Sequence, residues 1–163
     1  STGANTVQCI SYTKADGTGV VSAGIGTIPI LSVSLASDQS INTDTVTKVN
    51  LSTETLDTNN DFTSNTWTPT VSGKYLITVV GQIQGLSDND EVRVHIYKNS
   101  TSQARVTGYS GTGGTNLYAM SVSAVVEMDG SSDTADLRVF HDNGGSLNAS
   151  SPDCEMFAFK IAE

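Results

Sequence analysis

Hydrophobic and polar residues alternate along much of the second half of the chain. From Met120 to Met128 every second residue is Met, Val or Ala, and the intervening residues include Ser121, Ser123 and Glu127. A period of two places successive side chains on opposite faces of a strand, so this segment is predicted to be a half-buried β-strand. The same alternation predicts strands at residues 75–83, 92–97 and 154–161.

The turn signals between these segments favour an all-β fold. No stretch of a dozen residues keeps apolar positions at i, i+3, i+4 and i+7, so no helix is expected. Instead, Gly, Asn and Asp recur at intervals of about ten residues, as in Ser72-Gly73 and Asp129-Gly130, which is typical of a sandwich or barrel. At about 25 cal/mol per Å² of buried apolar area, one exposed ribbon cannot offset its ordering entropy, so the strands are expected to stack as two sheets.

The first part of the chain has a different pattern. Five glycines interrupt residues 1–45, and only residues 28–35 alternate like a strand. We therefore predict an irregular N-terminal arm or attachment segment at residues 1–45 and a sandwich head domain of eight to ten strands at residues 46–163. The arm either adds a strand to a neighbouring subunit or larger assembly, or it is a frayed terminus.

Charge narrows the range of partners. The chain has 8 Lys and Arg residues against 17 Asp and Glu residues, a formal net charge of −9. This balance repels polyphosphates and anionic lipids and excludes nucleic acid as an expected partner. No apolar run approaches the roughly 20 residues that span a bilayer, so membrane insertion is not expected. Cys9 and Cys154 are either two buried small side chains or a disulfide pair.

The motifs of common enzymes are missing from the sequence. The two histidines, His95 and His141, lack metal-binding spacing, and no G-x-S-x-G elbow is present. We therefore predict a protein that is not an enzyme and has no obligatory cofactor. Calcium is the one metal considered, because Asp88 and Asp90 share a turn from which oxygen ligands can project. Solvated turn residues are the alternative interpretation of both carboxylates.

Aromatic residues are spread over several predicted strands. On a face opposite the core, such rings either bury in a subunit interface or stack on sugars, and packing in the core is the alternative for each. The rings considered for an interface are Tyr75, Tyr97, Tyr118 and Phe157.

From about residue 46 to residue 163, the order of motifs resembles the trimeric globular-head family of the complement recognition protein and, at the level of the fold, tumour necrosis factor. The motifs are an opening strand, a Pro-x-x-x-Gly-x-Tyr turn, a Lys-Asn turn, an acidic-Gly turn and an aromatic last strand. They correspond to Lys48 to Leu51, Pro69 to Tyr75, Lys98-Asn99, Asp129-Gly130 and Met156 to Phe159. This resemblance implies an antiparallel jelly roll and a homotrimer.

The chain lacks the collagen-like stalk of complement heads. Residues 27–40 resemble instead the short arms of heads on phage and viral fibres, which implies attachment to other virion proteins through the arm. A host-surface glycan or protein would then bind exposed loops. The residues predicted to bind it are Asp88, Asn89, Asp90, Tyr109, Asn116, Asp142 and Asn143.

The leading functional hypothesis is a virion structural protein, a bacteriophage fibre or decoration subunit whose trimeric head adheres to the host surface. One alternative is a capsid or tail decoration protein with only a stabilising role. The other is a secreted lectin-like module that binds carbohydrate or protein. These hypotheses place the protein on a virion surface or outside a cell.

Overall fold

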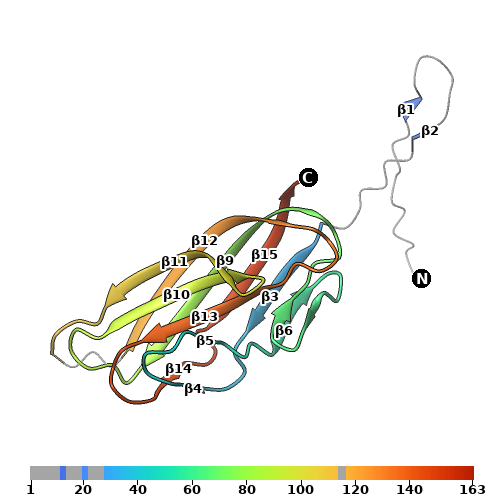
Figure 1. The fold of residues 1–163 in the computed structure, drawn as a ribbon. Helices are drawn as coiled ribbons and strands as arrows, with labels where there is room; N and C mark the ends of the chain where they lie inside the picture. Colours follow the sequence, from blue (N-terminus) through green and yellow to red (C-terminus); the bar gives the residue numbers. More distant parts are fainter. Residues whose placement is uncertain (1–11, 14–19, 22–27, 114–116) are drawn as a thin grey trace, which may run out of the picture.

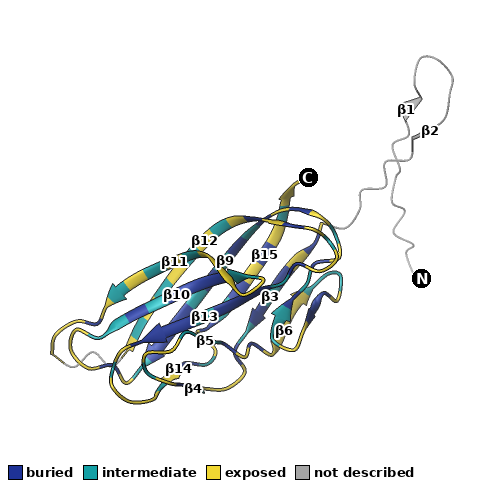
Figure 2. Cartoon of the chain, viewed as in Figure 1, coloured by how far each residue is buried: buried dark blue, intermediate teal, exposed yellow. Residues whose placement is uncertain are grey.

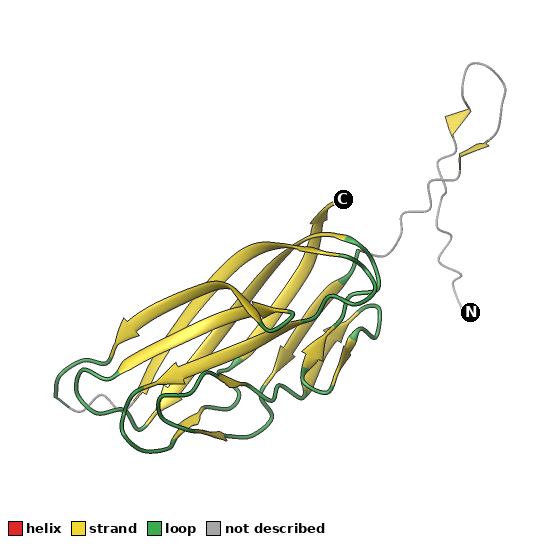
Figure 3. Cartoon of the chain, in the orientation of Figure 1, coloured by secondary structure: helices red, strands yellow, loops and turns green. Residues whose placement is uncertain are grey.

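The fold consists of two antiparallel sheets packed face to face (Figure 1). The computed structural model describes residues 12–13, 20–21, 28–113 and 117–163. Every regular element in this described part is a strand (Figure 3). Across these same residues no helix is long and apolar enough to cross a membrane.

The first sheet has the strand order β11-β10-β13-β8-β7, with β5 paired to β13. We refer to it as the six-stranded sheet. Its strands are β5 (Thr47–Lys48), β7 (Phe62–Thr63), β8 (Thr66–Trp67), β10 (Glu91–Lys98), β11 (Thr101–Tyr109) and β13 (Ala135–His141).

The second sheet has the order β4-β14-β9-β15-β3-β6, with β12 paired to the other edge of β9. We refer to it as the seven-stranded sheet. Its strands are β3 (Ile30–Ser34), β4 (Gln39–Ile41), β6 (Thr53–Asp57), β9 (Gly73–Gln84), β12 (Leu117–Met128), β14 (Leu147–Ala149) and β15 (Glu155–Ala162). A separate pair consists of β1 (Tyr12–Thr13) and β2 (Val20–Val21).

The prediction of an antiparallel jelly-roll sandwich is confirmed. In the described residues the two sheets contain thirteen strands, more than the eight to ten predicted, because several short strands pair at their edges. The alternation that predicted these strands also determines which face of each strand is buried. Tyr75, Ile77 and Val79 of β9 are buried between the sheets, whereas Leu76 and Thr78 lie on the other face of the strand.

The observed sandwich begins before residue 46. Strand β3 lies between β15 and β6, and β4 pairs with β14, so both belong to the seven-stranded sheet of their own chain. Leu31 and Val33 of β3 are buried in the core. The strand pattern at residues 28–35 therefore completes the subunit's own sheet.

The two sheets approach each other very closely at Gly81 of β9. A Cβ atom added there would lie 2.7 Å from Cγ2 of Val94 and 3.0 Å from Cγ1 of Val139, both on the opposite sheet. Only glycine allows this spacing without displacing β10 or β13. Farther along β9, the Tyr75 ring packs edge-on against Trp67 at 5.0 Å between centroids, and its hydroxyl donates to the Val71 carbonyl.

Cys154 lies in the same buried core. Its thiol donates to the carbonyl of Gln82 at 3.5 Å, and burial raises the pKa of this thiol. Cys154 is therefore a small buried side chain, and it is a free cysteine in the described structure. Cys9, its partner in the disulfide alternative, lies outside the described residues.

The elongated sandwich has two distinct ends (Figure 1). We define the base as the end where Pro29 enters β3 and β15 finishes; there the Lys160 amide donates to the Pro29 carbonyl at 3.2 Å. We define the apical end as the opposite one, formed by the β9–β10, β11–β12 and β13–β14 connections. Buried residues concentrate on the middle strands, and exposed ones on the loops (Figure 2).

A tight acidic turn closes the base between β12 and β13. Oδ1 of Asp129 accepts hydrogen bonds from the amides of Ser131, Ser132 and Asp133, each at 2.9 Å. Its Oδ2 accepts the Ser132 hydroxyl at 2.6 Å. These donors, above all the Ser132 hydroxyl, hold the pKa of Asp129 well below its usual range. Beside it, Asp133 forms an ion pair with Lys98 at 2.7 Å.

We expect Asp129→Asn to lower the free energy of unfolding at pH 7, because an amide cannot accept the same four hydrogen bonds. A folded-state pKa below the unfolded value of about 3.9 stabilises the fold above that pH, and this stabilisation is lost as pH falls through the folded-state value. The difference from wild type should therefore be full at pH 7 and shrink below about pH 4. Urea unfolding from pH 3 to pH 7 measures this difference.

The matched control is Asp44→Asn, an exposed aspartate in the left-handed region at φ 55°, which Asn tolerates. A pH-independent difference between Asp129→Asn and wild type would contradict a role for the charge.

Candidate functional site

The three loops that carry the predicted binding residues meet at the apical end. Asp88, Asn89 and Asp90 lie between β9 and β10, and Asp142 and Asn143 follow β13. Tyr109 ends β11 and is 61% exposed. The structure therefore brings these residues, distant in sequence, to one end of the sandwich. Asn116, the remaining predicted residue, lies outside the described part of the chain.

A buried serine joins two of these loops. The Ser110 hydroxyl donates to the carbonyl of Ser87 and accepts the amide of Asp90 at 2.8 Å. The Ser110 amide also donates to the Asp90 carbonyl at 2.9 Å. Because both partners of Ser110 lie in the β9–β10 loop, this side chain fixes the end of β11 against the start of β10.

The β13–β14 loop is tied to the same group. The Asn143 amide side chain donates to Oδ2 of Asp90 and to the Ser87 hydroxyl, the latter at 2.9 Å. Oδ1 of Asp142 accepts the Glu91 amide at 2.7 Å. Hydrogen bonds thus connect all three loops, and the apical end is a preorganised surface on a rigid scaffold, a common setting for binding residues.

The carboxylates of this surface serve mainly as acceptors for loop donors. Oδ2 of Asp90 accepts the Ser87 amide at 2.6 Å as well as Asn143, and Oδ1 of Asp88 accepts the Gly113 amide at 3.0 Å. Among the described residues, no group of three or more His, Cys, Asp or Glu side chains is placed to hold a metal ion. The arrangement therefore suits hydrogen bonding to a polar ligand better than the six to eight oxygen ligands of calcium.

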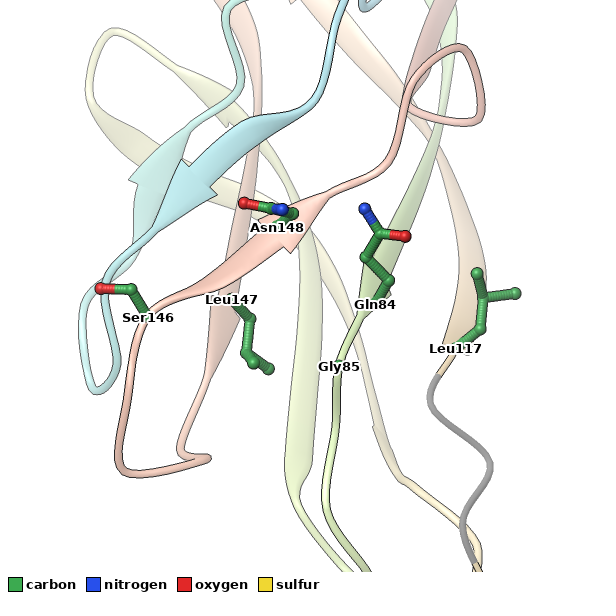
Figure 4. A pocket seen from close by; sticks show the side chains of 6 residues that line it. All are labelled: Gln84, Gly85, Leu117, Ser146, Leu147 and Asn148. Carbon is green, nitrogen blue, oxygen red and sulfur yellow. The ribbon is translucent and has the colours of Figure 1, made fainter.

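A shallow hollow of about 390 Å³ lies beside the apical loops, across the ends of β9, β12 and β14 (Figure 4). The Gln84 and Asn148 side chains come from neighbouring strands and occupy cross-strand positions, and Leu117 lies on the β12 side. Amide and hydroxyl groups thus lie next to apolar side chains, the mixed lining that small polar ligands use. The lining residues are Gln84, Gly85, Leu117, Ser146, Leu147 and Asn148.

A second candidate surface is the outward face of the seven-stranded sheet. Its register places Ile30, Phe159, Leu76 and Val125 in one row across β3, β15, β9 and β12. Phe159 is 43% exposed and Val125 57% exposed. Phe157 lies in the adjacent row, opposite Thr78 and Ser32. We call the first four residues the apolar row, and the apolar row together with Phe157 the apolar face.

Only one of the four predicted interface rings lies on the apolar face, namely Phe157. Tyr75 is fully buried inside the subunit. Tyr118 also points inward, packed against the core beside Gly108 of β11. Tyr97 lies on the outward face of the other sheet, with the Arg138 guanidinium 4.2 Å above its ring. The prediction that these four rings share one interface is thus corrected, because strand alternation turns Tyr75 and Tyr118 into the core.

The prediction from sequence missed Ile30, Leu76, Val125 and Phe159. Their signal was present in the composition of single strands: β15 has Phe157 and Phe159 on one face and Met156 and Ala158 on the other. A strand that is apolar on both faces buries one face in the core of its own subunit. Its other apolar face needs a second partner to cover it. The row itself depends on the pairing of four strands, which single-strand patterns do not specify.

Solved structures of similar fold are found among tumour necrosis factor ligands and complement globular domains. Murine APRIL at pH 5.0 matches with a TM-score of 0.61 and 11% identity over 82% of this chain and 99% of its own. The globular domain of zebrafish complement 1qA matches with 0.60 and 16% over 83% and 98%. The Eiger TNF of S. frugiperda matches with 0.61 and 10% over 83% and 94%.

These likenesses define the class of fold. The chain has the jelly-roll fold shared by tumour necrosis factor ligands and complement C1q globular domains, as the resemblance in its sequence implied. No protein-family model and no curated protein sequence matches the chain significantly. The relationship that is shown is therefore one of structure.

We expect Ser110→Ala to loosen the apical loops. The substitution leaves the Ser87 carbonyl and the Asp90 amide without their shared hydroxyl partner, which should lower the free energy of unfolding by about 1–3 kcal/mol. Amide exchange at Asp90 should accelerate, as measured by hydrogen–deuterium exchange. Thr112→Ala, at an exposed position of the same β11–β12 connection, is the control and should change neither quantity. Unchanged exchange at Asp90 in Ser110→Ala would show that the backbone alone holds the loops together.

Proposed function

We propose that this chain is a non-enzymatic homotrimeric binding module whose subunits meet through the apolar face and whose apical ends recognise a ligand. The observation that carries the proposal is the row of Ile30, Phe159, Leu76 and Val125 on an outward sheet face. Contiguous exposed apolar surface of this kind marks interaction sites, because it is costly to leave in water. A second and third copy of the chain are its proposed occupants.

The family that the sequence resembles supports this choice of partner. Its heads assemble as homotrimers around a three-fold axis, and closed symmetry lets one patch be covered in every subunit. The apolar face crosses β3, β15, β9 and β12 on the outward side of the sheet, so subunits packed there would stand side by side. Their three apical ends would then face the same direction, away from the three bases.

The proposed role of the module is adhesion. The described chain enters at the base, whereas the apical loops lie at the far end of the sandwich. An attachment at the base would leave the apical surface of Asp88, Asn89, Asp90, Asp142 and Asn143 facing outward. Its acceptors and donors suit the hydroxyl groups of a glycan or the polar groups of a surface protein.

The more specific part of the proposal comes from the arm. Strands β3 and β4 take most of residues 27–40 into the sandwich, so the attachment that we propose, that of a bacteriophage fibre or decoration subunit on the virion surface, would be made by the chain before residue 28. A secreted lectin-like module would share the same trimer and apical surface. A decoration protein that only stabilises a particle would share the trimer without ligand recognition.

The trimer predicts a solution mass of three times the 17.0 kDa of one chain. Phe159→Glu places a carboxylate in the centre of the apolar row. Burying this unpaired charge at each subunit contact of the trimer should cost more free energy than the apolar contacts provide. We expect the mass of this variant by light scattering to fall to that of one chain. Circular dichroism should show that its β-structure is retained.

Tyr109→Glu is the matched control, since it places the same charge on an exposed aromatic position outside the apolar face. Its mass should remain that of the trimer. A monomeric wild-type chain at micromolar concentration would remove the three-fold assembly from the proposal. So would a Phe159→Glu variant that stays trimeric.

Ligand recognition is tested by the binding of fluorescently labelled trimer to a glycan array and to a panel of bacterial strains. Tyr109→Ala combined with Asn89→Gly removes exposed apical contacts while keeping the hydrogen bonds of Ser110 and Asp90. We expect at least a tenfold loss of binding. The control combines Thr101→Ala and Gln103→Ala, both exposed at the base end of β11. A trimer that binds no surface at all would favour the purely stabilising role.

A further inference from the structure

Four basic side chains form a row on the outward face of the six-stranded sheet. The register pairs Lys48 of β5 with Arg138 of β13, Arg138 with His95 of β10, and His95 with Arg105 of β11. Directly paired residues point to the same face, and Val94 and Ile96 on either side of His95 point into the core. We call these four residues the basic row; its strands lie next to one another in Figure 1.

This concentration of positive charge is unusual for the molecule. The chain has a net charge of −9 and contains three arginines, and Arg93, Arg105 and Arg138 all lie on this one face. Like charges at directly opposed positions of a sheet destabilise it. At pH 7 the directly opposed like charges of the row are Lys48 and Arg138, with His95 between Arg138 and Arg105, so an anion bound there would relieve the remaining repulsion.

Carboxylates of the same face neutralise only part of the row. Asp136 pairs with Arg138 at 2.7 Å, and Glu91 pairs with Arg93 at 2.6 Å. Arg105 is exposed, and no described residue forms a hydrogen bond or ion pair with its guanidinium. Its guanidinium keeps all five donors available, in a geometry that suits a sulfate or carboxylate group.

Aromatic rings hold the other two arginines flat on the sheet. The Arg93 guanidinium lies 4.2 Å from the centroid of the Phe140 ring, and that of Arg138 lies 4.2 Å from the centroid of the Tyr97 ring. Stacking of this kind fixes a guanidinium in place. Nε and Nη2 of Arg93 already donate to Glu91, and those of Arg138 to Asp136. The charged surface around His95 is therefore preorganised.

His95 gives an independent indication of a ligand. Although it points outward, it is only 4% exposed, because the side chains around it cover its ring. Its Nδ1 contacts the Ser102 hydroxyl at 3.3 Å, whereas the buried Nε2 has no hydrogen-bond partner. Nε2 is itself buried, so an anion reaches it only when one of the side chains that cover the ring moves aside. A buried polar atom without a partner is costly, and an anion at this place would satisfy it.

We propose that the basic row is a binding site for an acidic glycan, in which Arg105 and His95 Nε2–H donate to one sulfate or carboxylate group. The net negative charge of the chain opposes long polyanions, which favours recognition of a single oxyanion on a neutral sugar framework. Tyr109 extends the face beyond Arg93 with an exposed ring on which a sugar can stack. All of these residues come from one subunit, so the site does not rest on the proposed trimer.

Binding of an anion to the basic row should be coupled to protonation of the His95 ring. Burial, followed by the charges of Arg105, Arg93 and Arg138, lowers the pKa of His95, so the ring is neutral at pH 7. A bound anion favours the imidazolium and raises this pKa, so affinity should increase as pH falls. The groups facing His95 are Ser102 and Arg105 of β11, Arg138 and Asp136 of β13, Lys48 of β5, and Tyr97 with the Glu91–Arg93 pair on β10 itself.

The test is calorimetric titration of the whole chain with three probes: a sulfated tetrasaccharide, a sialylated trisaccharide and inorganic sulfate. Arg105→Gln should weaken binding of the acidic sugar at least tenfold. Lys74→Gln removes one positive charge from an exposed position on the other sheet and should have less than a twofold effect. His95→Gln should still bind, but without the increase in affinity between pH 8 and pH 5.5 that the wild type shows.

Equal losses in Arg105→Gln and Lys74→Gln would overturn the proposal, because the attraction would then be a property of overall charge. Failure of both sugars to bind would overturn it as well. If inorganic sulfate binds as tightly as the sugars, the sugar framework contributes nothing to recognition, and the proposal of a glycan ligand is wrong. Nitrogen chemical shifts of the His95 ring report its protonation directly, and a ring that stays neutral on addition of the acidic sugar at pH 6 would exclude the contact with Nε2. None of these outcomes depends on the oligomeric state, which tests the trimer separately.

Discussion

The close approach of the two sheets around β9 is the constraint on which the rest of the structure depends. At Gly81 the side chains of Val94 and Val139 leave no space for even a methyl group. Interiors packed at this density accept only apolar side chains of the right volume, and they exclude ions without partners. The charged residues in the middle of β10 and β13, Arg93 and Arg138, therefore lie on the outward side. Lys98, at the base end of β10, instead donates to the Glu127 carbonyl of β12 and pairs with Asp133. Strands β9 and β15 carry apolar residues on both faces.

The two outward faces consequently acquire different chemistry. The seven-stranded sheet presents Phe157, Phe159 and Val125, and the six-stranded sheet presents its arginines over Tyr97 and Phe140. An apolar face suits burial against copies of the same chain, whereas a basic face with fixed guanidiniums suits a dissolved anionic ligand. The apical loops form a third surface, in which hydrogen bonds among Ser87, Asp90 and Ser110 restrict movement. Three kinds of interaction are thus proposed for three regions of one small sandwich, with Tyr109 at the border between the apical loops and the basic face.

The alternation of single strands predicted the class of fold, because burial of one face is a local property. It correctly separated Val92, Val94 and Ile96 from Arg93, His95 and Tyr97. The loops between those strands were also predicted to carry polar residues, and antiparallel order brings three of them to one end. The pairing of distant strands could not be predicted in this way, since it depends on register. For that reason the alignment of Lys48, Arg138, His95 and Arg105 was not foreseen. Tyr75 and Tyr118 are a different case, because each lies in phase with the inward residues of its own strand and the alternation already indicated a place in the core.

The position of the base has a consequence for how such a module can vary. Residue 28 and residue 163 both lie at the base, where Pro29 and Lys160 are hydrogen-bonded. Polypeptide joined at either side would therefore project from one end and leave the opposite end unobstructed. Substitutions in the apical loops can accumulate without affecting the attachment at the base. Equally, the polypeptide attached at the base can be exchanged without affecting the loops. The sandwich is thereby suited to recombination as a cassette, in nature or as a scaffold for displaying chosen loop sequences.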